Sequence, residues 1–172
     1  MRFSYLTLII VMLVIGIAVA SDLEKATLKG VSGFYVSVSV DAGNSPLRLR
    51  NAQVQDDVEM ALRHAGVPVF VEGQLSADSL WNAATIHVTI DARTDTLHAD
   101  KANPCLIAHY FLDVRQNARL ERDTTVLAPT TTWRVSGIEV CLSKNATGAV
   151  RQALQAAAEG LIRDFREVNP RK

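Results

Sequence analysis

The chain has little of several residue types on which common site chemistries depend. Only two cysteines occur in 172 residues, and neither a Cys-x-x-Cys redox pair nor a four-ligand Cys/His zinc pattern is present. No Gly-x-Ser-x-Gly segment or recognisable cysteine-protease context occurs either. Lys plus Arg equal Asp plus Glu at 18 each. Nothing therefore favours a nucleic acid or an anionic membrane surface as a partner, because both select for clustered basic residues.

The longest apolar run stands at the start of the chain. It covers residues 6–19, follows Arg2 and closes with the small-x-small triplet Ala18-Val19-Ala20 before Ser21, which is the order of a secretory signal peptide. A retained single-pass anchor is the alternative, but residues 3–20 number only 18, against about 20 for a bilayer span. We expect residues 1–20 to be a signal peptide cleaved after Ala20. The protein would then be exported, periplasmic or secreted, with no stable membrane span after cleavage.

Export bears directly on the two cysteines, Cys105 and Cys141. An oxidising compartment favours pairing of thiols, so the sequence predicts a disulfide between them. Closing a loop of this size contributes about 3–4 kcal/mol in the chain-entropy model, and it requires Cα atoms within about 7 Å of each other. Two buried, unpaired thiols are the alternative.

Alternating and apolar runs indicate the strands. Residues 34–40 and 85–91 alternate apolar with polar side chains, which is typical of half-buried strands. Residues 105–114 are apolar on both faces, which predicts a central strand or a covered outer face. Residues 124–135 form another extended run, bent or at a sheet edge because Pro129 cannot donate to a ladder.

Two segments have helical periodicity. In the first, apolar residues recur at helical spacing over 54–65, with Asn51 expected as the N-cap, Gly66 as the stop and a short strand at 69–71 beyond it. The second covers residues 146–168. Its apolar stripe comprises Val150, Leu154, Ala157, Leu161, Phe165 and Val168.

This order of elements predicts an α+β fold. We expect a two-layer sandwich in which two amphipathic helices pack on one face of an antiparallel-rich sheet of about four to five strands. Cleavage leaves residues 21–172, a chain of 152 residues that matches one domain. The sequence therefore predicts a single α+β domain after the signal peptide.

One group of polar residues is a candidate for acid–base or metal chemistry. His87 and Asp91 face outward on one predicted strand but stand about 13 Å apart. Residues 92–104 are polar and small, which indicates a long functional loop or a mobile hairpin tip. That loop would have to fold back to bring His98 or Asp100 into a site. Because this spacing matches no known ligand or catalytic pattern, we predict no catalytic, metal-binding or cofactor-binding residue.

The remaining candidates have structural interpretations. His64 is expected at a helix end, where a cation favours the dipole, and His109 is expected to face inward. Trp133 is expected in the core. Asn145 begins an Asn-x-Thr glycosylation acceptor, but it serves better as a helix cap in a bacterial protein.

Three motifs carry a family resemblance. The segment from Asp56 to Val69 resembles the "acidic-V-E-x-x-L-R-x-A-G-I-x-V" segment of a family of exported bacterial proteins. The Thr131-Thr132-Trp133 triplet and the closing Asp164-Phe165 and Val168-Asn169-Pro170 follow in the same order. The resemblance implies bacterial export and a single domain but no activity. More loosely, the layout is similar to the amino-terminal domain of the Tol translocation protein and to lipopolysaccharide-assembly lipoproteins.

Two functions remain open at this point. The first is a non-enzymatic binding or envelope-assembly module whose partner is another envelope protein or envelope component. The missing catalytic motifs and the two-sided apolar strand at 105–114 favour it. The second is a small hydrolase or metal-dependent enzyme using His87, Asp91 and the 92–104 loop. We favour the first because catalysis needs convergent titratable groups.

Overall fold

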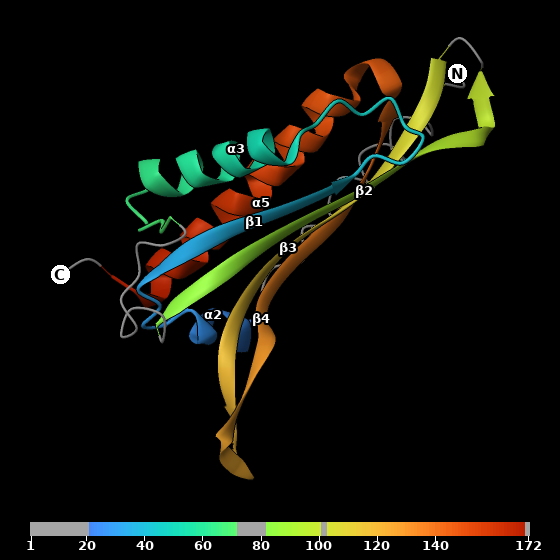
Figure 1. Ribbon diagram of the computed structural model, residues 1–172. Helices are drawn as coiled ribbons and strands as arrows, with labels where there is room; N and C mark the ends of the chain where they lie inside the picture. The colour runs from blue at the N-terminus through green and yellow to red at the C-terminus, as the bar shows by residue number, and fades with distance from the viewer. Residues whose placement is uncertain (1–20, 72–81, 101–102, 171–172) are drawn as a thin grey trace, which may run out of the picture.

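A computed structural model describes residues 21–71, 82–100 and 103–170 (Figure 1). The predicted signal peptide at 1–20 lies outside the described residues. The elements are α2 (Asp22–Thr27), β1 (Gly33–Asp41), α3 (Asn51–His64), β2 (Ala83–Asp100), β3 (Asn103–Leu120), β4 (Asp123–Leu142), the 3-10 turn η1 (Ser143–Asn145) and α5 (Ala146–Val168). Within the described ranges, no helix is both long and apolar enough to cross a membrane.

The four strands form one open sheet in the order β1-β2-β3-β4. β1 and β2 are parallel, whereas β2, β3 and β4 are antiparallel neighbours. Helices α3 and α5 lie side by side on one face of this sheet, and among the described residues no helix covers the opposite, open face (Figure 1). The predicted α+β fold, with two helices on one face of a largely antiparallel sheet, is confirmed.

The core lies between the sheet and the two helices. Alternation in β2 directs Ile86, Val88 and Ile90 toward the helices, where all three are buried. The last helix has the predicted bounds, and the ring of Phe165 packs edge-to-face on Phe34 of β1 with centroids 5.4 Å apart. Trp133 is buried in the core as predicted.

A buried polar contact joins β4 to α5. The Trp133 indole N–H donates to the Asp164 carboxylate at 3.1 Å, and Asp164 is only 1% exposed. The Arg163 guanidinium donates to the other oxygen of the same carboxylate. Each buried polar group in this cluster thus has a partner, as the low dielectric of a core requires.

Residues 92–104 do not form a long functional loop, and of the two predicted alternatives the hairpin is the closer one. β2 continues to Asp100 and β3 begins at Asn103, so most of this stretch lies in a long hairpin. Ala92 is fully buried opposite Ala108, and Thr94 pairs with Leu106. Small and polar residues do not give the alternating pattern that predicts a strand. Hydrogen bonds to β3 nevertheless hold this part of β2 extended.

Three local predictions also need correction. Asn51 is the first residue of α3 rather than its cap, because its side-chain oxygen accepts a hydrogen bond from the Val40 N–H. The strand expected at 69–71 is reduced to one bridge between Val69 and Phe34. His109 is exposed on the open face of the sheet, since alternation along β3 directs its neighbour Ala108 into the core.

β4 is an edge strand, which is one of the two alternatives, bent or at an edge, that Pro129 left open. Its register against β3 shifts where Val114 pairs with Trp133 but Arg115 pairs with Thr131, so Thr132 is an extra residue. Such a bulge increases the local twist of a strand. The predicted run ended at residue 135, whereas β4 continues to Leu142.

The short helix α2 was not predicted, although its start carries a recognisable pattern. Ser21 and Glu24 form a capping box, in which the Glu24 N–H donates to the Ser21 hydroxyl and the Ser21 N–H donates to the Glu24 carboxylate at 2.7 Å. Serine followed three residues later by glutamate is a known sign of a helix start. The first residue after the predicted cut therefore belongs to the folded domain.

Cys105 and Cys141 lie on neighbouring strands, and both thiols are free. Cys105 pairs with Leu142, and Cys141 pairs with Leu106. The two cysteines are thus offset by one residue, and alternation directs their side chains to opposite faces. The predicted closeness of the two segments is confirmed, whereas the disulfide itself stays a prediction.

Candidate functional surfaces

The residues of the predicted enzyme site do not converge. His87 and Asp91 both lie on the open face of β2, but Asp91 forms an ion pair with Arg93 at 3.0 Å. Arg93 also binds Asp41 at 3.0 Å. Because β2 runs on to Asp100, the segment that carries His98 leads away from His87 instead of folding back. Within the described part of the chain, no three His, Cys, Asp or Glu side chains are placed to hold a metal ion.

His87 lines a small pocket on the open face of the sheet, and the charged groups beside it pair with one another. Its cross-strand neighbour Asp113 is buried and accepts two hydrogen bonds from Arg134, at 2.6 and 3.0 Å. Burial lowers the pKa of His87, and the charge of Arg115 lowers it further, while Asp113 acts in the opposite direction. The Asp113 charge is thus compensated by arginine, and His87 is kept neutral. This arrangement holds strands together and presents no activated nucleophile.

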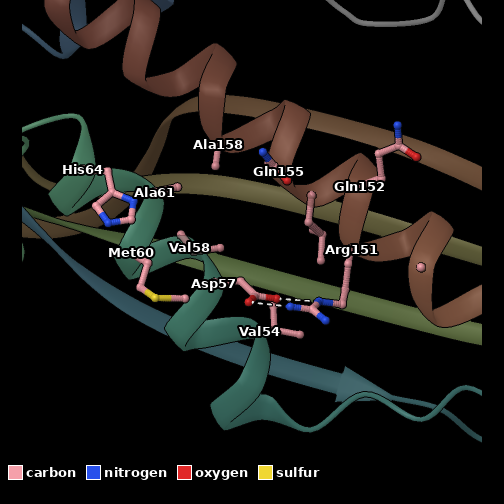
Figure 2. Close-up of a pocket in the computed structure, with 12 residues that line it drawn as sticks. Val54, Asp57, Val58, Met60, Ala61, His64, Arg151, Gln152, Gln155 and Ala158 are labelled. Atoms are coloured by element: carbon pink, nitrogen blue, oxygen red, sulfur yellow. Dashed lines mark hydrogen bonds and ion pairs between the residues drawn. The ribbon is translucent and has the colours of Figure 1, made fainter.

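A groove of about 450 Å³ lies between α3 and α5. Figure 2 shows Asp57 of α3 and Arg151 of α5 pointing toward each other across it, joined by two hydrogen bonds of 2.8 Å. His64, at the end of α3 as predicted, lies at one end of the groove. The apolar side chains of the lining are Val54, Val58, Met60, Ala61, Leu154 and Ala158. The one ion pair of the lining is internally compensated, and apart from His64, Gln152 and Gln155 the rest of the lining is apolar or glycine.

The open face of the sheet carries an unusual row of apolar side chains on β4. Ile138, Val140 and Leu142 are 59%, 56% and 43% exposed, and we name these three residues the β4 stripe. They alternate with Glu139 and Cys141, so all three point to the side that no helix covers. Large apolar residues that are gathered rather than scattered on a surface mark interaction sites.

The neighbouring strand extends this surface. Ile107 of β3 pairs with Val140 and is only partly covered, and Phe111 lies on the same face. This face of residues 105–114 is the outer apolar side that the sequence predicts. On β2, by contrast, the equivalent positions are polar, including Thr89 and Asp91. The apolar patch is therefore confined to the β4 side of the sheet.

The edge of β4 is protected along one part and open along another. Near the bulge, the Thr27 hydroxyl of α2 donates to the Thr132 carbonyl at 3.1 Å, and Pro129 removes a backbone donor. Figure 1 shows α2 beside this lower part of β4. From Arg134 to Leu142, no described element pairs with the outer edge of the strand.

The β4 stripe was missed by the sequence analysis, although its pattern is visible. Ile138, Val140 and Leu142 alternate with shorter or charged residues, as in a half-buried strand. Only the tertiary structure shows that this strand lies at an edge and that its apolar side faces away from the helices. Period alone does not tell which side of a strand is buried.

Comparisons with known proteins yield likenesses of fold only. No protein-family model and no curated protein matches the chain, so the predicted family resemblance stays a prediction. A PelC dodecamer variant from Paraburkholderia phytofirmans is similar over 78% of this chain and 89% of its own, with 15% identity and a TM-score of 0.44.

Two lipoproteins are also among the similar solved structures. The minor lipoprotein from Acinetobacter baumannii is 10% identical over 81% of this chain and 96% of its own, with a TM-score of 0.41. The rare lipoprotein B from Shewanella oneidensis is 11% identical over 78% and 96%, with a TM-score of 0.39. The similarity to lipoprotein domains is loose, and at these scores it carries no inference about activity or partners.

Proposed function

We propose that this chain is an exported, non-enzymatic binding module whose partner is a protein of the cell envelope. The observation that carries the proposal is the β4 stripe, three large side chains exposed side by side on an edge strand. Covering apolar surface contributes about 25 cal/mol per Å². A strand edge adds backbone donors and acceptors that a partner strand can satisfy.

The distribution of titratable groups supports binding rather than catalysis. Asp91, Asp113 and Asp57 each pair with an arginine of the same chain. His87 faces a carboxylate that is already neutralised by Arg134. Among these described groups, no base is therefore aimed at a nucleophile, as hydrolytic chemistry needs.

Export is the second part of the proposal, and it rests on residues 1–20. The capping box at Ser21 is compatible with a cut before this residue, because a free Ser21 amine can still donate to the Glu24 carboxylate. Intact-mass measurement of the protein recovered from outside the cytoplasm should give a chain that starts at Ser21. Recovery of the full-length chain in the membrane fraction would contradict this part.

Site-specific photo-crosslinking tests the binding surface. A photoreactive amino acid placed at Val140 in the producing cells should give protein adducts. The matched control is Thr89, which is exposed on the same face but on a polar strand. Adducts at Val140 that exceed those at Thr89 at least tenfold support the proposal. Equal yields at the two positions, or no adduct at either, would contradict it.

A further inference from the structure

We propose that the partner bound at the β4 stripe is a second copy of this chain, and this inference rests on the proposed function. Residues 138–142, at the end of the open part of β4, would pair with the same residues of another copy. The two strands would run antiparallel around a two-fold axis at Val140. Two four-stranded sheets would then become one continuous sheet of eight strands.

The first argument is the selective protection of the edge. Natural sheets block edges with proline, charge, bulges or covering elements. β4 has all of these around Thr132, where Pro129, the bulge and α2 meet. Between Val135 and Leu142 it has neither proline nor lysine, and its one charged residue is Glu139. An edge that is blocked along one part and open along the other fits a partner strand of limited length and defined register.

The second argument is the symmetry of the open segment. An isologous contact requires a surface that matches itself when reversed. About Val140, the positions on the open face have the same polarity in both directions, since Ile138 and Leu142 are both apolar. Antiparallel pairing at this register sets Val140 against Val140 and Ile138 against Leu142 of the second copy. Each apolar side chain of the stripe gains an apolar cross-strand neighbour.

The third argument concerns charge. Centring the pair on Val140 places Glu139 opposite Cys141 of the second copy, on the helix side of the sheet. Centring it on Glu139 would set two carboxylates directly against each other, which is destabilising. A shift to Ile138 would place Leu142 opposite Arg134 and leave the stripe poorly matched. The Val140 register alone among these joins apolar to apolar without opposing like charges.

Cysteine cross-linking tests this register directly. In a Cys105→Ser, Cys141→Ser background, Val140→Cys places two thiols at the axis. Their Cα atoms would lie about 4.5–5.5 Å apart, within disulfide range. Ser136→Cys is the control on the same face and strand, where four residues on each side of the axis separate the thiols by about 26 Å. Mild oxidation of the mature protein should give a covalent dimer with Val140→Cys and none with Ser136→Cys.

Sedimentation equilibrium supplies the second measurement. The mature protein should sediment as a dimer, and Val140→Lys should raise the dissociation constant at least tenfold because it places a charge on the axis beside its own copy. Thr89→Lys, an exposed change on β2, should leave the constant unchanged. Thermal melting of each variant confirms that it folds.

The outcomes separate this inference from the proposed function. A monomer in sedimentation, together with Val140 photo-adducts that contain a different protein, would overturn the second copy while the binding module stands. A monomer without adducts would overturn both. A covalent dimer through Ser136→Cys rather than Val140→Cys would overturn the proposed register.

Discussion

The two faces of the sheet differ in how their apolar side chains are covered. On the helix side, Phe34, Ile90 and Leu112 are buried by α3 and α5, elements of the same chain. On the open side, β2 meets water with threonine, histidine and aspartate, whereas β4 presents the stripe of Ile138, Val140 and Leu142. The open face thus has a polar part on β2, which water can solvate, and a part on β4 that leaves apolar side chains exposed.

This difference indicates that one set of side chains stabilises the folded chain and another set is available for binding. Side chains between the sheet and the helices are covered by folding alone, so their loss should lower the free energy of unfolding. Side chains of the β4 stripe gain little cover from folding, so their loss should act mainly on association.

The largest expected effect is on the helix side. Phe165→Ala removes a ring that packs on Phe34, and such changes typically cost about 3–5 kcal/mol. Ile138→Ala, the matched change on the open face, should stay within about 0.5 kcal/mol in dilute, monomeric protein. Urea denaturation measures both. Similar losses for the two variants would show that the open face is buried within the monomer.

The state of the two cysteines should be coupled to the β4 stripe. Cys105 and Cys141 are offset by one residue on opposite faces. A one-residue slip that sets them directly opposite would turn every β4 side chain to the other face, which includes Val140. We therefore expect protein with this disulfide to lose Val140 photo-adducts at least tenfold.

Thiol titration of the exported protein measures this coupling. Protein whose β4 stripe is exposed should have two titratable thiols, and protein whose β4 stripe is covered should have none. A bridged protein whose Val140 adducts are undiminished would show that the sulfurs join across the strands without a change of register.

A smaller effect is expected for the buried polar contact between β4 and α5. Asp164→Ala leaves the Trp133 indole N–H without its acceptor, which costs about 1–3 kcal/mol for a buried donor. Trp133→Phe in the same background completes a double-mutant cycle by urea denaturation. Additive losses would contradict the coupling. Arg163→Ala is not a neutral control, although Arg163 is exposed, because it also binds Asp164.

The smallest expected effect is the pH dependence of His87 on the open face. Its pKa is lowered chiefly by burial and then by Arg115, so the unfolded chain takes up a proton first as the pH falls. The contribution of His87 to stability is therefore present above its usual pKa of about 6.5 and is lost as the pH falls through that range toward its lower folded value. His87→Gln should melt with a weaker dependence on pH between about 7.5 and 5.5. An unchanged dependence would contradict the shift.

Much of the fold follows from periodicity. The bounds of α5 and the buried face of residues 85–91 are predicted because large apolar side chains repeat there at 3.6 or 2 residues. The extension of β2 beyond Asp91 is not predicted, because its small and polar residues give too weak a periodic pattern. Gly137 likewise interrupts the strand pattern near the end of β4. In the structure, the ring of Tyr110 occupies the space that a side chain at position 137 would need.

The candidate site was predictable only in part. The outer apolar face of residues 105–114 marks one strand of the patch, but its continuation across Val140 depends on the pairing of β3 with β4. His109 was expected inside because Ile107 and Phe111 flank it in the sequence. In the structure these flanking residues face outward with it, since the opposite side of β3 fills the core.

By itself, the sequence determined the α+β class, the final helix and the alternation of each clear strand, because these depend on interactions within a few residues. Only the tertiary structure decided that β4 lies at an edge, that its apolar side turns away from the helices and that the two thiols face opposite sides. Those properties depend on strand order and register. They are set by which strands pair across long separations, and local periodicity carries no information about that choice.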